Sequence, residues 1–170
     1  ARYKLVGQII LGLFISYIIF QDNSIINYNI IANNKHLELI ASSSISTPFI
    51  ANGFFDLKFL YIPLIILIIT GTSNAINLTD GLDGLATGLV AISTLVFAAI
   101  AYASGRIDYS NYLNIIFIPN SGELFIFCLS MIGACIGFLW YNAHPAKVFM
   151  GDVGSLSLGA AIGTLAILLK

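Results

Sequence analysis

The sequence predicts an all-α polytopic membrane protein in which residues 1–170 form one integral membrane domain with about five transmembrane helices. Hydrophobic residues make up 58% of the chain and charged residues only 9%, whereas about a quarter of the residues of a soluble domain are charged. The apolar residues also gather into five long runs, each close to the length of a membrane-crossing helix. Lipid is therefore the expected solvent.

Low charge also limits the classes of partner. The formal net charge is −1, so the chain has no basic field with which to collect nucleic acid, and no nucleic-acid partner is expected. Any polyanion must be bound at a local site. Membrane lipid is the partner that the composition itself predicts.

The predicted spans are the five apolar runs. A helix rises about 1.5 Å per residue, so the longest run covers roughly the 30 Å of a hydrocarbon core. The first run follows Arg2 and Lys4 as a secretory signal would, but it lacks a small-residue cleavage pattern, and four further runs follow. The runs are Leu5 to Phe20, Phe59 to Gly71, Leu85 to Ser104, Leu124 to Tyr141 and Leu156 to Leu169.

Two loops separate the spans on one side of the membrane. The long polar stretch from Gln21 to Lys58 contains Asn52-Gly53 between short apolar runs, which predicts a small β-hairpin and an external cap. A shorter loop runs from Gly105 to Gly122. Counting crossings places the chain start, the loop near Asp80 and the loop near Asp152 together on the other face.

Small residues indicate how the helices pack. Glycine pairs at four-residue spacing allow close helix approach in lipid, and we interpret them as packing within the protein, with a homodimer as the alternative. Cys128 and Cys135 lie seven residues apart on one helix face, which indicates packing rather than metal or disulfide chemistry. The glycine pairs are Gly84/Gly88, Gly133/Gly137 and Gly159/Gly163.

Polar chemistry is concentrated between the second and third runs. In one interpretation a helix begins near Gly81, so that Asp80 caps it and Asp83 lies in its first turn. In the other interpretation the cluster binds a ligand. Burying an aspartate at the centre of a span costs about 2.5 to 3.5 kcal/mol, and less at a span end, so aspartates in such a chain are usually functional. Gly81 and Gly84 favour the second, since glycine lets a ligand approach the backbone. The polar residues are Asn74, Asn77, Asp80 and Asp83.

A second acidic loop precedes the fifth run. Asp152 either caps that helix or binds Mg²⁺, which takes few protein carboxylates and fills its other positions with water and phosphate oxygens. Phe149 either anchors the interface or stacks on a nucleobase. His144 is interpreted as a hydrogen bonder that orients the loop rather than as a general base, and Asn142 precedes it.

Two segments carry a resemblance to a known family. Asn74 to Gly88 (NAINLTDGLDGLATG) and Gly137 to Gly159 (GFLWYNAHPAKVFMGDVGSLSLG) closely resemble the phospho-N-acetylmuramoyl-pentapeptide transferases, within the polyprenyl-phosphate sugar-1-phosphate transferase superfamily. The Asn-Ala-His-Pro-Ala run and Thr79 before Asp80 are similar to the muramoyl branch. The resemblance covers nearly the whole chain and is weakest from Gln21 to Lys58.

The resemblance implies a reaction. Phospho-MurNAc-pentapeptide would pass from UDP-MurNAc-pentapeptide to undecaprenyl phosphate, giving lipid I and UMP, at the cytoplasmic face of the bacterial inner membrane. Asp152 would be the Mg²⁺ ligand, and Asp152, Asp80, Asp83 and Asn142 would form the catalytic set. The implied uridine and diphosphate site comprises Asn74, Asn77, Asp80, Gly81, Leu82, Asp83 and Phe149.

The resemblance leaves alternatives open. A polyprenyl-phosphate N-acetylhexosamine-1-phosphate transferase is the nearest, and a secondary transporter is more remote because a transporter would need acids in mid-span. The family also carries an adjacent aspartate pair and a histidine cluster, and neither is present here. We therefore expect residues 1–170 alone to be inactive, and the residues present do not decide between direct transfer and a covalent intermediate.

Overall fold

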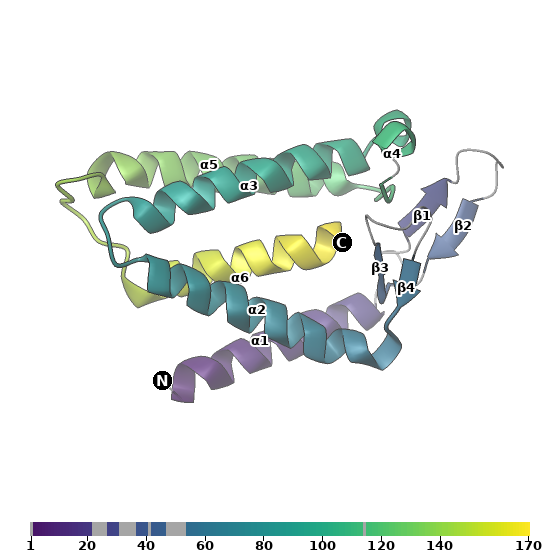
Figure 1. The fold of residues 1–170 in the computed structure, drawn as a ribbon, viewed down its shortest axis with the longest axis horizontal. Coiled ribbons are helices and arrows are strands. Elements are labelled where there is room, and N and C mark those ends of the chain that lie inside the picture. Colours follow the sequence, from purple (N-terminus) through teal and green to yellow (C-terminus); the bar gives the residue numbers. More distant parts are fainter. Residues whose placement is uncertain (1, 22–26, 31–36, 41, 47–53, 114) are drawn as a thin grey trace.

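Five long helices dominate the chain, as the apolar runs predict (Figure 1). The computed structural model describes residues 2–21, 27–30, 37–40, 42–46, 54–113 and 115–170. Each long helix is long and apolar enough to cross a membrane, which confirms the predicted polytopic all-α class. They are α1 (Arg2–Gln21), α2 (Tyr61–Thr79), α3 (Leu85–Ser104), α5 (Ser121–Asn142) and α6 (Gly151–Leu169).

Short elements fill the loops at the end of the bundle where α1 finishes. Strands β1 (Asn27–Ile30) and β2 (Leu37–Ile40) pair antiparallel, as do β3 (Ser44–Ser46) and β4 (Phe54–Asp56). A 3₁₀ turn, η2 (Lys58–Leu60), leads into α2, and α4 (Ile107–Leu113) lies between α3 and α5. The β1–β2 hairpin and α4 were not predicted, because short elements give little sequence signal.

A hairpin before α2 was predicted, and β3 and β4 form one. Their register pairs Ser46 with Phe54, whereas a two-residue turn at Asn52-Gly53 would pair Phe54 with Ala51. The predicted turn at Asn52-Gly53 itself lies outside the described residues.

Two helices reach further toward the acidic loops than their apolar runs. Helix α2 continues past Gly71 to Thr79, and α6 begins at Gly151 rather than at Leu156. The added turns are polar, but their side chains find partners: the Thr72 hydroxyl donates to the Ile68 carbonyl at 2.9 Å, for example. The predicted boundaries were therefore wrong, because apolar-run counting stops at polar residues that a helix can still accommodate.

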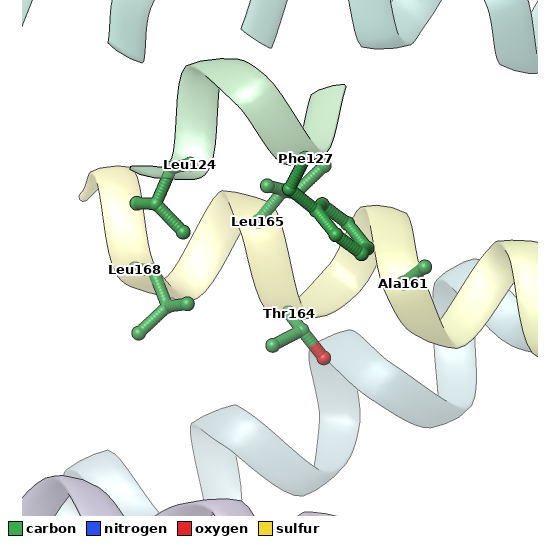
Figure 2. A pocket seen from close by; sticks show the side chains of 6 residues that line it. All are labelled: Leu124, Phe127, Ala161, Thr164, Leu165 and Leu168. Carbon is green, nitrogen blue, oxygen red and sulfur yellow. The ribbon is translucent and has the colours of Figure 1, made fainter. Parts of the chain in front are cut away.

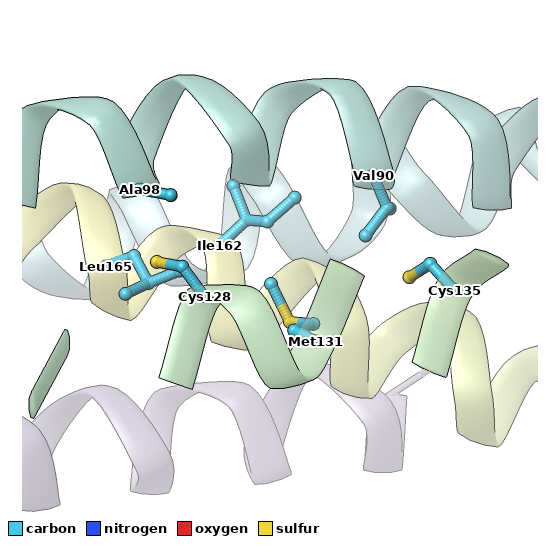
Figure 3. Packing of buried hydrophobic residues seen from close by; sticks show 7 residues of the cluster. All are labelled: Val90, Ala98, Cys128, Met131, Cys135, Ile162 and Leu165. Atoms are coloured by element: carbon cyan, nitrogen blue, oxygen red, sulfur yellow. The ribbon is translucent and has the colours of Figure 1, made fainter. Parts of the chain in front are cut away.

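Helix α6 lies in the middle of the bundle, with α2 on one side and the α3–α5 pair on the other (Figure 1). The main core cluster joins α3, α5 and α6 (Figure 3). Cys128 and Cys135 are 0% and 3% exposed within it, which confirms their interpretation as packing residues. The other members are Val90, Ala98, Met131, Ile162 and Leu165.

One of the three glycine pairs makes a close helix contact. A Cβ on Gly159 would lie 2.5 Å from the Ser73 Cα, and one on Gly163 would lie 2.5 Å from the Thr72 Oγ1, so these glycines bring α6 against α2. A Cβ on Gly133 or Gly137 would meet no atom within 4 Å of the described chain. Packing within this part of the protein does not explain that second pair.

The α5–α6 face also carries an apolar groove of about 320 Å³ (Figure 2). Leu124, Phe127 and Leu168 are among its lining residues. These side chains come from the first half of α5 and the second half of α6, which places the groove far along α6 from Asp152. Among its described lining residues the polar side chain is Thr164, whose hydroxyl donates to the Ala160 carbonyl of the same helix at 2.8 Å.

Candidate functional site

The acidic loops and the chain start meet at one end of the bundle (Figure 1). The ammonium of Lys4, in the first turns of α1, pairs with the Asp152 carboxylate in the first turn of α6. Asn77, near the end of α2, also reaches Asp152. These contacts confirm the prediction that the chain start and both acidic loops lie on the same side.

Asp152 joins three helices. Its Oδ2 accepts a hydrogen bond from Lys4, and its Oδ1 accepts one from the Asn77 Nδ2 at 2.8 Å. The same Asn77 amide lies 2.9 Å from the Ser155 hydroxyl. Met150 rather than Asp152 occupies the N-cap of α6, so the capping interpretation of Asp152 is wrong. Its side chain instead accepts the hydrogen bonds from Lys4 and Asn77.

Asp80 ends one helix instead of starting the next. It is the C-cap of α2, with φ −75° and ψ 38°, and α3 begins only at Leu85. Gly84 takes the N-cap of α3 at φ +71°, a left-handed conformation that glycine adopts without strain. The interpretation that a helix begins near Gly81, with Asp80 and Asp83 in its first turn, is therefore wrong.

The Asp80 carboxylate has an unusual environment. Within the described chain no group donates a hydrogen bond to it. Burial, and secondarily the negative charge of Asp152, raise the pKa of Asp80 above its ordinary value. The two carboxylates are therefore close enough to repel each other, a repulsion that a cation between them would relieve.

Asp83 connects the two acidic loops. Its Oδ2 accepts a hydrogen bond from the Ala146 backbone N–H at 3.1 Å and lies 3.1 Å from the His144 Nδ1. The His144 side chain is 86% exposed. This geometry agrees with the interpretation of His144 as a residue that orients the loop.

Asn142 holds the same two loops from inside. It is 3% exposed. Its Oδ1 accepts hydrogen bonds from the Gly84 N–H and the Thr87 hydroxyl, both at 3.2 Å, and its Nδ2 donates to the Val148 carbonyl at 2.9 Å. The structure thus gives Asn142 three protein partners, and its contact with reacting atoms stays a prediction.

The remaining predicted residues fall into two groups. Gly81, Leu82 and Phe149 are exposed at the loops, and a Cβ on Gly81 would meet only the Leu78 carbonyl oxygen, at 3.9 Å, so its backbone is open to a ligand. Asn74 lies one turn deeper, where its Nδ2 donates to Gln8 Oε1 at 3.1 Å and to the Thr70 carbonyl at 2.8 Å. Because the Asn74 Nδ2 already donates to two protein groups, the predicted contact with the nucleotide would have to come from the Asn74 Oδ1.

Sequence reasoning missed Lys4 and Gln8. Lys4 is 148 residues from Asp152 in the chain, a separation at which no spacing pattern operates. The one usable signal was that Lys4 lies at the start of a predicted span, on the same membrane face as the two acidic loops. Gln8 carried a signal of its own, because a carboxamide inside an apolar run needs a partner.

The donor set fits Mg²⁺. Among the described residues no three histidine, cysteine or acidic side chains gather into a protein-only metal site. Mg²⁺ does not require one, since it binds one or two carboxylates and completes its octahedron with water and phosphate oxygens. Asp80 and Asp152 could supply two such carboxylates; burial first, and the negative charge of Asp152 second, raise the pKa of Asp80.

Residues 1–170, the whole chain, match glycosyl transferase family 4. This chain belongs to that family. It is 46% identical to the phospho-N-acetylmuramoyl-pentapeptide-transferase of Gemmatimonas aurantiaca over 99% of the chain and 42% of that protein. The enzymes of the same name from Thermodesulfovibrio yellowstonii and Rickettsia massiliae are 55% and 48% identical over 74% and 86% of the chain.

These relatives support the resemblance inferred from the two acidic segments. The chain spans 42%, 35% and 40% of the three relatives, about two fifths of their length. Together with the five apolar helices, family membership identifies the chain as part of an integral membrane protein.

Proposed function

We propose that the chain is the central part of an enzyme that transfers phospho-MurNAc-pentapeptide from UDP-MurNAc-pentapeptide to undecaprenyl phosphate. The products are lipid I and UMP. The observation that carries the proposal is the meeting of Lys4, Asn77 and Asp152 at the same bundle end as Asp80 and Asp83. A soluble nucleotide and a lipid phosphate can both reach such an end.

In this proposal the two acidic loops hold the nucleotide. Gly81 and Leu82 offer open backbone, Asp83 fixes the facing loop, and Phe149, 72% exposed, provides an aromatic face for the uracil. Because the proposed UDP substrate is soluble, this face would lie in the cytoplasm and the protein in the bacterial inner membrane.

The residues around Asp152 are proposed to hold the diphosphate through a metal. Asp152 and Asp80 would bind Mg²⁺, which neutralises charge on the diphosphate and the leaving UMP. Asn77 orients the Asp152 carboxylate, and Lys4 balances its charge while the site is open. Preorganised charge of this kind is the main source of catalysis in phosphoryl transfer.

The position of the acids favours an enzyme over a transporter. Asp152 and Glu123 lie in the first turns of α6 and α5, and Asp80 ends α2, so the described acids of the bundle lie at span ends. A coupling-ion pathway would require carboxylates near the middle of the membrane.

Substrate preference tests the proposed function against the N-acetylhexosamine-1-phosphate transferases. The intact protein, in membranes with undecaprenyl phosphate and Mg²⁺, is expected to release UMP from UDP-MurNAc-pentapeptide and to form lipid I. A parallel reaction with UDP-GlcNAc should release little UMP, and chelation by EDTA should stop the first reaction. Preference for UDP-GlcNAc would overturn the proposal.

A further inference from the structure

Gln8 of α1 and Asn74 of α2 form a polar pair inside two membrane spans. The Asn74 Nδ2 donates to the Gln8 Oε1 at 3.1 Å. Gln8 is 8% exposed, and its own Nε2 is buried without a partner among the described residues. A buried carboxamide is costly in an apolar medium, so burial of apolar surface does not account for the pair.

The pair lies one helical turn below the Asp152 cluster. Gln8 follows Lys4 by four residues in α1, and Asn74 precedes Asn77 by three in α2. Residues three or four apart share a helix face. The two helices therefore carry two adjacent polar contacts, Gln8 with Asn74, and Lys4 and Asn77 with Asp152.

The other contacts between α1 and α2 have no directional preference. Gly12 packs on Ile66, where an added Cβ would lie 2.9 Å from the Ile66 Cγ1, and Ile19 joins an apolar cluster with Ile65. Such contacts permit small sliding and rotation, because lipid tails are as apolar as the side chains they replace. Within the described chain, the Asn74–Gln8 bond is the hydrogen bond that joins α1 to α2.

Helix α1 depends on α2 for its place beside α6. It packs on α2, while its polar contact with α6 is the Lys4–Asp152 pair. A rotation or slide of α1 on α2 would move the Lys4 ammonium away from Asp152 without disturbing the α2–α6 packing at Gly159.

We propose that Gln8 is a positioning residue, whose hydrogen bond to Asn74 sets the register of α1 on α2 so that Lys4 and Asn77 meet on Asp152. The effect of this hydrogen bond on turnover rests on the proposed function. The register itself can be measured without turnover.

Zero-length cross-linking measures the register directly. A water-soluble carbodiimide joins an amine to a carboxylate only when the two are in contact, and mass spectrometry detects the Lys4–Asp152 isopeptide in the intact protein. Gln8→Met, which keeps length and removes the amide, is expected to lower its yield about threefold or more, the factor an average interhelical hydrogen bond in a membrane protein carries. The exchanged double variant, Gln8→Asn with Asn74→Gln, should restore the yield.

Ser16→Ala is the matched control. Ser16 is also a buried polar residue of α1, but its hydroxyl donates to Gly12 of the same helix, at 2.7 Å, so its loss should leave the cross-link unchanged. An unchanged cross-link yield in Gln8→Met, or a yield in the double variant as low as in Gln8→Met, would overturn the proposal. Neither outcome depends on which nucleotide sugar the enzyme uses.

Discussion

Replacing Asp152 by alanine in the intact protein is expected to lower turnover about a thousandfold, equivalent to about 4 kcal/mol of transition-state stabilisation. The substitution removes a carboxylate that Lys4 and Asn77 hold in place and that we propose binds Mg²⁺. Asp152 packs against no apolar neighbour in the core clusters, so the protein should still insert in the membrane. UMP release per inserted protein is the measurement.

The control for that experiment is Asp108→Ala. Asp108 is an exposed carboxylate in the first turn of α4, at the opposite end of the bundle. Its loss should leave turnover within about twofold, because an isolated surface charge far from the site contributes little. Retained Mg²⁺-dependent turnover in Asp152→Ala would remove Asp152 from the metal site.

Gly159→Ala is expected to destabilise the bundle by about 2 to 3 kcal/mol, although alanine favours a helix over glycine by about 1 kcal/mol. The new Cβ would lie 2.5 Å from the Ser73 Cα and 2.6 Å from the Thr72 carbonyl oxygen. Both are backbone atoms that cannot rotate away, so α2 and α6 must separate. Separation would stretch the 2.8 Å bond from the Ser73 hydroxyl to the Leu156 carbonyl.

Thermal unfolding in detergent measures that loss, and Gly137→Ala is its control. A Cβ on Gly137 would meet no other packed element within 4 Å among the described residues, so the same substitution there should be neutral or slightly stabilising. Turnover of Gly159→Ala should also fall, since Asn77 and Asp152 are carried by the two separated helices. Equal unfolding temperatures for the two variants would show that the α2–α6 approach is less close than described.

The five spans could be predicted because membrane helices are defined by apolar length, which composition reports directly. Their polar ends could not: the Thr72 and Thr79 hydroxyls donate to carbonyls of their own helix, so α2 accommodates polar residues at which a hydropathy count stops. The third apolar run begins at Leu85, as α3 does, whereas the alternative of a helix start near Gly81 was wrong. Gly84, not Gly81, takes the left-handed conformation that opens the helix.

The candidate site, too, could be predicted from the sequence only in part. Asp80, Asp83 and Asp152 stand out as charges in an apolar chain, and crossing counts place them on one face. The partners of these groups come from distant segments, such as Lys4 on Asp152 and Ala146 on Asp83. Those pairings depend on how the helices cross, and that information is not contained in local spacing.

The sidedness of the two acidic loops is the most direct test of the account. Single cysteines at Leu82, Val153 and Tyr112, which are 69%, 83% and 87% exposed, can be labelled by a membrane-impermeant maleimide in sealed vesicles of either orientation. The native Cys128 and Cys135 are buried and should stay unlabelled. We expect positions 82 and 153 to react from the cytoplasmic side and position 112 from the other. Labelling of 82 and 153 from opposite sides would contradict a shared site.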